Sequence, residues 1–415
     1  MPPVRRIDHE GLAKLTKHHE SSEQLNNSTP PFRQLHAAYS DRSAEAKLAR
    51  QRGKSIVGYV GNTVPVELIM AAGCYPLRLA PVSGDTGTAD RYIETFADLD
   101  TRLIVELFMA GELDFLSLLI IPRSTESYHK LYLSLRELKR VGASRGGPEI
   151  TLYEILHTQQ GSSRDYGLAR TRELAQRLSA IGAAAVDDGS LRDALTATNQ
   201  TRSLLAKLQQ VRRGAENPPS GYEAQVVAVA ASFVEPHVYN RLLADWLGDA
   251  VWPTGKGPRL LVQGCPLDHA YLHEAVDQAG GRVVAEDGDW GARQAAPLIA
   301  DGNDPLAAIF EHYYAGVPCP RLFPHALANR WFSETLQAGG IDGVIFYLPT
   351  PEDTYGWDFP NQRAAVEAAG LPWILIRSDV RNAKDRPAAA SQLNAFVATL
   401  DSRHGAQANR LNNIS

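Results

Sequence analysis

Continuous apolar segments that alternate with helical segments constrain the fold of this chain more than any other sequence feature. In the second half they occupy the stretches 259–263, 282–287, 342–349 and 372–377. Each is separated from the next by residues with a helical pattern. A strand covered by helices on both faces has no polar side, as is usual in parallel sheets. We therefore expect a parallel sheet of βαβ units in this half.

The first half begins in the same way and then changes character. Buried strands are expected over 55–61, in a stretch that follows a helix stopped by Gly73 and Pro76, and over 115–121. Residues 32–54 and most of 127–252 have helical patterns. The expected fold class is α/β, with two Rossmann-like doubly wound parallel sheets that face each other across a cleft. The expected parts are an N-terminal helical arm (1–50), a first α/β domain with a helical insertion (51–252), a second α/β domain (253–400) and a flexible tail (401–415).

Charge and composition argue against two classes of partner. The 415 residues carry a formal net charge of −5 and show no basic stripe, so we expect no nucleic-acid binding. No apolar run is long enough to cross a bilayer, so we expect no membrane association. Cys74, Cys265 and Cys319 lie far apart and form no CxxC pair, which favours a reducing, cytoplasmic location.

Polar loops at the ends of the predicted strands supply the candidate binding residues. Ligands of parallel sheets bind at the carboxyl ends of strands, beside helix N-termini that favour anions. None of these loops has a GxGxxG fingerprint or a Walker A sequence, so the pattern indicates a small ligand without specifying a nucleotide. The candidate ligand-binding residues are Asn62, Thr63, Arg123, Ser124, Thr125, Cys265 and Cys319.

Side chains that could transfer protons lie near the same loops. The candidate catalytic residues are Glu67, His129 and Glu352, and His129 is well placed as a general base at an early helix turn. A role without chemistry is more common for these residue types. Most carboxylates are solvated or cap helices, and most free cysteines are buried. Other charged residues in or beside these loops are Arg78, Asp98, Asp100, Glu126, Asp287, Asp289, Arg293, Arg321 and Asp353.

Several of the loop motifs together resemble one enzyme family. The stretches "GYVGNTVPVELIMAAGCYPLRLAP" (58–81), "LDFLSLLIIPRSTESYHKL" (113–131) and "VPCPR" (317–321) are similar to motifs of the 2-hydroxyacyl-CoA dehydratase and benzoyl-CoA reductase family, of the dehydratase D-component type. Their order and spacing match from Gly58 to Asp379. The resemblance implies two Rossmann-like domains, a dimer of related subunits and an acyl-CoA ligand. It also implies a [4Fe-4S] cluster held by three cysteines and an ATP-dependent activator protein that supplies electrons.

The family's cluster-ligand positions lack cysteine in this chain. By resemblance, the three positions fall at Asp98, Thr125 and Glu352. Thiolates hold iron–sulfur clusters, and oxygen ligands do not match their softness. We therefore expect no cofactor in this chain and a degenerate iron–sulfur site, with a [4Fe-4S] cluster possible only in a partner subunit. The resemblance also places Asn62 and Glu67 near the acyl end of the ligand.

Three functions remain open at this point. The first is a subunit or paralogue that binds an acyl-CoA-type ligand in the cleft, as part of an acyl-CoA dehydratase (a lyase) or an aromatic acyl-CoA reductase. The second is different chemistry at a metal held by Asp98, Glu126, His129 and Glu352, since carboxylate and imidazole ligands suit divalent metals. The third is a non-catalytic subunit whose cleft binds a partner. The sequence does not decide whether the chain is itself an enzyme.

Overall fold

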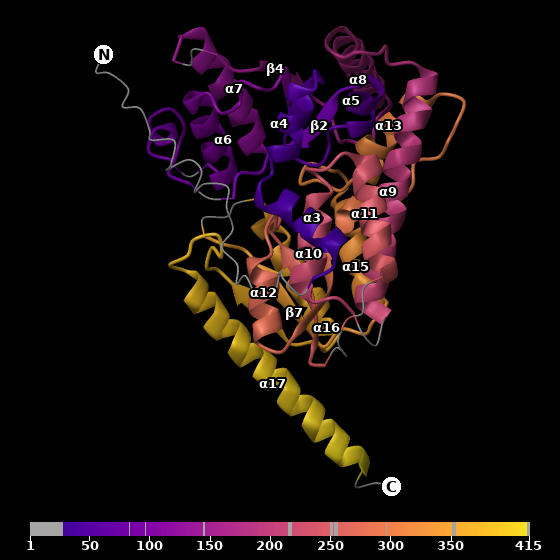
Figure 1. Ribbon diagram of the computed structural model, residues 1–415. Helices are drawn as coiled ribbons and strands as arrows, with labels where there is room; N and C mark the ends of the chain where they lie inside the picture. Colours follow the sequence, from indigo (N-terminus) through magenta and orange to yellow (C-terminus); the bar gives the residue numbers. More distant parts are fainter. Residues whose placement is uncertain are drawn as a thin grey trace.

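Two four-stranded parallel sheets form the centre of the fold (Figure 1). The computed structural model describes residues 28–412, except 83, 96, 144–145, 215–217, 250–251, 253–255, 296 and 351–353. The first sheet contains β1 (Ile56–Tyr59), β2 (Tyr75–Arg78), β3 (Leu118–Pro122) and β4 (Glu149–Tyr153). The second contains β5 (Arg259–Gly264), β6 (Arg282–Asp287), β7 (Gly343–Tyr347) and β8 (Trp373–Ile376). The α/β expectation is therefore confirmed, and so are two parallel sheets.

The two sheets have the same strand order. It is β2-β1-β3-β4 in the first sheet and β6-β5-β7-β8 in the second. In each sheet the chain moves from the first strand to one neighbour and then returns to the other side of that strand. This reversal creates a crevice at the carboxyl ends of β1 and β3 and another at those of β5 and β7, which is where ligands of such sheets bind.

The helices around the first sheet begin and end at recognisable residues. They are α5 (Val66–Ala71), η1 (Ala89–Arg91), α6 (Leu99–Ala110) and α7 (Glu126–Arg140). Helix α6 ends at Gly111, whose φ of 79° lies in the left-handed region that glycine adopts without strain. Helix α7 begins after Thr125, whose side chain accepts a hydrogen bond from the backbone of Tyr128. Local sequence signals thus fix both ends.

The N-terminal helical pattern over 32–54 is interrupted, contrary to the single helix expected there. The structure has α3 (Pro30–Ser40) and α4 (Ala44–Gln51), with Arg42 between them. Arg42 is 8% exposed and donates hydrogen bonds to the backbone oxygen of Ala80 and to the carboxylate of Asp268. The helix is interrupted at Arg42, where the guanidinium turns inward to bind these partners, which are distant in sequence. Residues 1–27 lie outside the described part.

The range 127–252 is mostly helical, as expected, but it also contains a strand. Its helices after α7 are α8 (Gly161–Ile181), α9 (Asp188–Gly214), α10 (Gly221–Ala230) and α11 (Pro236–Asp249). Strand β4 was not predicted. It is an edge strand and most of its residues are only partly buried, so it lacks the continuous apolar run that identified the other strands.

Helix α9 connects the two sheets along one side of the molecule (Figure 1). It packs against α5 beside the first sheet and against β6 of the second. Arg212, near its C-terminal end, is buried and lies 3.4 Å from the carboxylate of Glu286 on β6. The helical insertion therefore holds the two halves together and forms one wall of the space between them.

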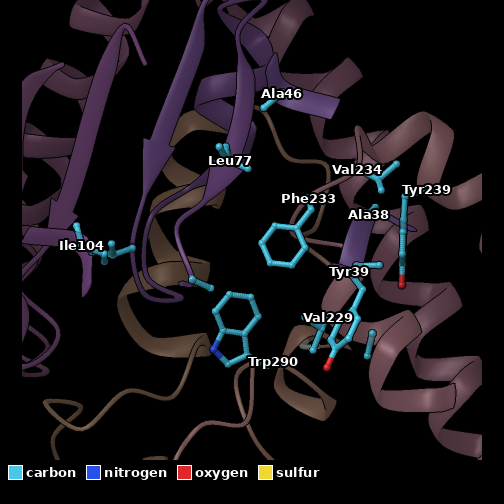
Figure 2. Packing of buried hydrophobic residues seen from close by; sticks show 14 of the residues in the cluster. Ala38, Tyr39, Ala46, Leu77, Ile104, Val229, Phe233, Val234, Tyr239 and Trp290 are labelled. Atoms are coloured by element: carbon cyan, nitrogen blue, oxygen red, sulfur yellow. The ribbon is translucent and has the colours of Figure 1, made fainter. Parts of the chain in front are cut away.

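The largest hydrophobic cluster crosses from one half of the molecule to the other. Figure 2 shows Leu77 of β2, Phe233 after α10 and Trp290 after β6 within this cluster, near Tyr39 of α3. The ring centroids of Phe233 and Trp290 are 6.1 Å apart. Because these side chains are buried together, the position of the β6 loop is fixed relative to the first sheet.

The remaining elements follow β5 along the chain, and those over 305–316 pack in the hydrophobic cluster of the first sheet. They are α12 (Tyr271–Gln278), η2 (Ala292–Ala295), α13 (Pro305–Glu311), the π-helical turn η3 (His312–Gly316), α14 (His325–Ala328), α15 (Arg330–Gln337), η4 (Tyr355–Trp357), α16 (Phe359–Ala368) and α17 (Arg386–Asn412). Helix α17 packs on α12 and β8 through Leu393, Val397 and Leu400, and it continues into the range 401–415. Among the helices described, none combines the length and apolar character needed to cross a bilayer.

Candidate functional site

The carboxyl edges of the two sheets face each other, and the loops that follow the strands meet between them. Asn62, after β1, donates a hydrogen bond of 3.0 Å to the backbone oxygen of Pro318. The residues that line a small cavity at this contact include Asn62, Gly264 at the end of β5, Asp287 at the end of β6 and Tyr355 of η4. We call the space between the two carboxyl edges the interdomain cleft.

Arginine–aspartate pairs join the two sides of this cleft. Arg78, at the end of β2, lies 2.7 Å from Asp289 after β6. Arg42 lies 2.6 Å from Asp268 after β5. A third pair joins Asp100 of α6 to Arg381 after β8. Ion pairs that are shielded from water interact more strongly than exposed ones, so these contacts favour the closed arrangement.

A larger cavity of about 130 Å³ lies in the cleft beside α9. Its lining combines residues of β1 and β2 with residues that follow β6 and with residues of α9 and η3. The polar and charged members of the lining are Tyr59, Asn62, Arg78, Thr198, Thr201, Arg202, Ser232, Asp289, Arg293, Gln294, His312 and Tyr313. A cavity at a domain interface with several convergent polar groups is the usual form of a ligand site in such folds.

One wall of this cavity rests on a buried carboxylate. Glu67 of α5 has no exposed surface, and its oxygens lie 2.6 Å from Arg202 Nη2 and 2.9 Å from the hydroxyl of Tyr313. Burial disfavours the charged form of Glu67, but the Arg202 guanidinium outweighs it and holds the pKa of the carboxyl below its usual value. Glu67 is therefore an anion at neutral pH, and it orients Arg202 and Tyr313 from behind the cavity surface.

Arg78 and Asp289 form another part of the lining. The Arg78 guanidinium donates 2.9 Å to the Asp289 backbone oxygen and lies 3.4 Å from the ring centroid of Trp290. Among the residues that the structure describes, Arg78 Nε and Asp289 Oδ1 have no hydrogen-bond partner, although both atoms are buried. Buried polar atoms are normally satisfied, so this donor and this acceptor are unusual.

The predicted residues after β3 have structural partners. Thr125 Oγ1 accepts from Tyr128 N at 3.2 Å and so caps α7. Ser124 is buried beside Gly61, where a Cβ atom would lie 2.9 Å from the Tyr128 ring and the φ of 70° also favours glycine. Arg123 lies 2.5 Å from Glu154. The structure therefore brings the loops after β1 and β3 together but pairs Arg123 with a residue after β4.

The remaining predicted residues, including the other candidates for proton transfer, lie at separate places in the structure or outside its described part. His129 Nδ1 lies 3.6 Å from Glu126 on the first turns of α7, and Glu126 also pairs with Arg321. His129 does not line either cavity. Thr63 is buried next to Asn62, and Asp98 occupies the N-cap position of α6. Glu352 and Asp353 lie outside the described residues.

The cysteines do not fit an iron–sulfur cluster held by this chain. Such a cluster needs several thiolates that meet at one point. Cys74 precedes β2, at the amino edge of the first sheet, whereas Cys265 follows β5 and Cys319 follows η3 beside the cleft. Burial raises the pKa of the Cys74 and Cys319 thiols to about 11, so both remain protonated at neutral pH. The sheet separates Cys74 from the cleft, and two cysteines remain near it.

Metal binding by other ligands has no assembled site in the described part of the chain. There, no three side chains of His, Cys, Asp or Glu lie close enough together to hold a metal ion. The proposed set that included Asp98, Glu126 and His129 also needs Glu352, which is not described. Glu126, which is one member of that set, already forms an ion pair with Arg321.

Several residues of the cleft could not be selected from sequence motifs. Arg202 and Tyr313 lie 135 and 246 positions from Glu67 and belong to no motif loop. Tyr355 lies in the cleft, close to the undescribed 351–353 segment. Arg78 and Asp289 were two of many charged residues near the predicted loops. Their contact, between positions 211 residues apart, identifies them as part of the site. The sequence around one residue does not indicate which distant residue it contacts in the fold.

Comparison with known proteins places most of the chain in one family. A family model described as 2-hydroxyglutaryl-CoA dehydratase, D-component, matches residues 62–400. The (R)-phenyllactyl-CoA dehydratase beta subunit of Clostridium sporogenes is 20% identical, over 85% of this chain and 94% of that protein. The putative dehydratase subunit YjiM of Escherichia coli is 24% identical, over 85% and 93%. The (R)-2-hydroxyglutaryl-CoA dehydratase beta subunit of Acidaminococcus fermentans is 22% identical, over 85% and 94%.

Proposed function

Because the chain belongs to the 2-hydroxyglutaryl-CoA dehydratase D-component family, we propose that it is a dehydratase-type subunit that binds an acyl-CoA-type ligand in the interdomain cleft. The cavity of about 130 Å³ between the strand ends and α9 carries this proposal. It lies where doubly wound sheets bind ligands, and it contains polar groups from both halves. Closure of the cleft over a ligand would exclude water from it.

Asn62 is the residue that we place closest to the thioester. It lines both cavities, so it lies where a ligand would pass from one to the other. Thr63 and Ser124 are buried beside it and hold the loop in place. Arg202 and Tyr313, oriented by Glu67, form the far wall for the acyl chain. In this arrangement Glu67 is a positioning residue and does not touch the ligand.

The same proposal gives this chain no iron–sulfur cluster of its own. Its cysteines do not converge, and the pKa of two of the thiols is raised by burial. Electron transfer, if the complex performs it, would then rely on a cluster in a partner subunit and on an activator protein. The beta subunits of the phenyllactyl-CoA and 2-hydroxyglutaryl-CoA dehydratases are, by name, parts of larger enzymes. We propose the corresponding arrangement here, a dimer with a related subunit in the cytoplasm.

An exposed tryptophan supports a protein partner. Trp357 of η4 is 83% exposed, and Tyr355 of the same turn lines the cleft. Large exposed aromatic side chains are enriched among the residues that dominate protein interfaces. We propose that the partner subunit covers Trp357 at the rim of the cleft.

The ligand-binding proposal is tested by isothermal titration calorimetry with a 2-hydroxyacyl-CoA thioester. We expect saturable binding by the wild-type chain and at least tenfold weaker binding by Thr201→Phe, which fills the cavity. Thr196→Phe is the matched control, because Thr196 lies on the same helix with an exposed side chain and does not line the cavity. Thermal unfolding of each variant shows whether it remains folded.

The outcomes of this experiment distinguish a ligand site beside α9 from a ligand site elsewhere and from the absence of ligand binding. Binding that Thr201→Phe weakens and Thr196→Phe preserves supports a ligand site beside α9. Equal weakening by both variants contradicts that location. Absence of thioester binding, both alone and with a co-purified partner, contradicts the ligand-binding function.

A further inference from the structure

We propose that Glu286 is a positioning residue of the ligand site, because its carboxylate holds the loop after β6 in place relative to α9 and so fixes two walls of the cavity. This inference rests on the proposed ligand-binding function and adds a residue that acts from behind the cavity surface. We call residues 288–291, between β6 and η2, the β6 loop. Glu286 itself lines neither the cavity beside α9 nor the small cavity at Asn62.

The Glu286 carboxylate is held by two buried side chains. Its Oε2 lies 2.6 Å from His273 Nε2 of α12, and its Oε1 lies 3.4 Å from Arg212 Nη1 of α9. Glu286, His273 and Arg212 are 3%, 0% and 1% exposed. Burial opposes the charged form of Glu286, but Arg212 and His273 outweigh it and lower the pKa to about 2. Glu286 is therefore an anion at neutral pH, and separating it from these partners is costly.

Gly291 allows the β6 loop to lie directly against this carboxylate. A Cβ atom at position 291 would overlap Oε1 and the carboxyl carbon of Glu286 and would lie 2.9 Å from its Cγ. The far end of a flexible side chain usually moves aside for a methyl group. Glu286 lacks that freedom, since its movement would break the contacts with His273 and Arg212. A methyl group at this position would therefore displace the β6 loop or disrupt the buried ion pair.

The β6 loop determines where several lining residues lie. Asp289, Arg293 and Gln294 line the cavity beside α9. The backbone amide of Arg293 donates to the oxygen of Gly288 at 3.0 Å. The backbone amide of Gln294 donates to the oxygen of Gly291 at 3.1 Å. A displacement of the loop would therefore move these three side chains relative to the rest of the cavity.

Helix α9 supplies another wall and is tied to the same carboxylate. One face of this helix lines the cavity, with residues three or four positions apart, namely Thr198, Thr201, Arg202 and Leu205. Arg212 lies near the C-terminal end of the same helix and reaches Glu286. Glu286 thus contacts both the α9 wall, through Arg212, and the β6 loop, through Gly291. A change at this point would alter the position of one wall relative to the other.

The first test compares two glycine variants by isothermal titration calorimetry, with 2-hydroxybutyryl-CoA as the probe. Gly291→Ala adds a methyl group against Glu286, although Gly291 lines neither of the two cavities of the cleft. We expect this variant to bind the thioester about tenfold more weakly than the wild type. Gly302→Ala is the matched control, because Gly302 is exposed, lines neither cavity and has open space at its Cβ position. It is expected to keep the wild-type affinity.

A second comparison assigns the effect to Glu286. Glu286→Ala removes the atoms that the methyl group of Gly291→Ala would meet. The loss of affinity caused by Gly291→Ala is measured in the wild-type chain and in the Glu286→Ala background, so that the loss of the buried charge cancels. We expect a loss of about tenfold in the wild-type chain and none in the Glu286→Ala background. An equal loss in both would contradict the role of Glu286.

Hydrogen exchange measures the order of the loop without any ligand. We expect peptides that contain residues 288–294 to exchange faster in Gly291→Ala than in the wild type, whereas peptides from β1 and β3 stay unchanged. Gly302→Ala should leave all of these peptides unchanged. The glycine comparison and this measurement decide the question even where Glu286→Ala does not fold.

The outcomes separate this inference from the proposed function. Wild-type affinity in Gly291→Ala, an equal loss in Gly302→Ala, or unchanged exchange of the β6 loop would overturn the role of Glu286 and leave thioester binding standing. Absence of thioester binding by the wild-type chain would overturn both.

Discussion

Arg78 Nη2 lies 2.7 Å from Asp289 Oδ2, and this contact joins the carboxyl end of β2 to the loop after β6. Trp290, next in sequence to Asp289, covers the guanidinium and packs on Phe233 in the central hydrophobic cluster. The ion pair and the aromatic packing therefore act together at one point of the cleft. They hold the two sheets in the closed arrangement that forms the cavity beside α9.

We predict that Asp289→Ala lowers the free energy of unfolding by about 3–5 kcal/mol, because Arg78 is left buried without a counter-ion. Replacing both residues by leucine should cost less than the single substitution, since no charge remains. Urea unfolding measures each value. Asp301→Ala is the control, because Asp301 is 71% exposed in its pair with Arg192 and should contribute about 0–1 kcal/mol. A loss below 1 kcal/mol for Asp289→Ala would contradict a buried, stabilising pair.

The buried carboxylate behind the cavity gives a second prediction. Glu67→Gln keeps the shape of the side chain but removes the charge that neutralises Arg202, so we expect a loss of about 3–5 kcal/mol in unfolding free energy. Glu137→Gln is the control, since Glu137 is 57% exposed and pairs with Arg140 on the surface of α7. Equal, small losses for the two variants would show that Glu67 is not held as an anion by Arg202.

Asp277 gives a prediction for the pH dependence of stability. It accepts hydrogen bonds from the backbone of Gly221 and Tyr222 at the start of α10. Burial raises its pKa to about 7, despite the opposing effects of these bonds and of His273 and Arg212. The folded state then binds the proton more tightly than the unfolded state does. The free energy of unfolding should therefore fall as the pH rises from about 4 to 7.

The variant Asp277→Asn keeps one of the two accepting oxygens and removes the titration. Its unfolding free energy, measured in urea at pH 5 and pH 7.5, should change less between the two values than that of the wild type. The expected difference is about 1–3 kcal/mol. Identical pH dependence in both proteins would mean that the Asp277 pKa is not raised in the folded state.

Thr125 allows a capping role to be separated from a ligand-binding role. Thr125→Ala removes the oxygen that accepts from Tyr128 N, so it should lower stability by about 1 kcal/mol. Thr125→Ser retains that oxygen and should restore most of the loss. Both variants should keep the thioester affinity within about twofold of wild type, because the hydroxyl is used by the helix. A tenfold loss of affinity in Thr125→Ala at unchanged stability would assign Thr125 to the ligand instead.

The sequence predicts the two parallel sheets well because their strands are buried on both faces and form continuous apolar runs. Strand β4 does not fit that rule, since it lies at an edge and is only partly covered. The break between α3 and α4 follows from the contacts of Arg42 with Ala80 and Asp268, the latter 226 positions away. A local helical pattern cannot register such distant partners.

The candidate site is predictable in its position and less so in its residues. The strand-end rule selects the loops after β1, β5 and β6, whose residues line the two cavities, and Asn62 lines both. It cannot tell Thr125, which caps a helix, from a residue that faces the cleft. The pairs Glu67–Arg202 and Arg78–Asp289 span different elements, so only the folded arrangement identifies them.

The proposed function is that of an acyl-CoA-binding dehydratase-type subunit without its own iron–sulfur cluster. The most direct test of the cluster is iron and sulfide analysis of the anaerobically purified chain, separated from any partner, together with its visible absorption spectrum. We predict a colourless protein with far less than one iron atom per chain. A brown protein with about four iron atoms and matching sulfide per chain would contradict the account, because it would require thiolate ligands that converge in this subunit.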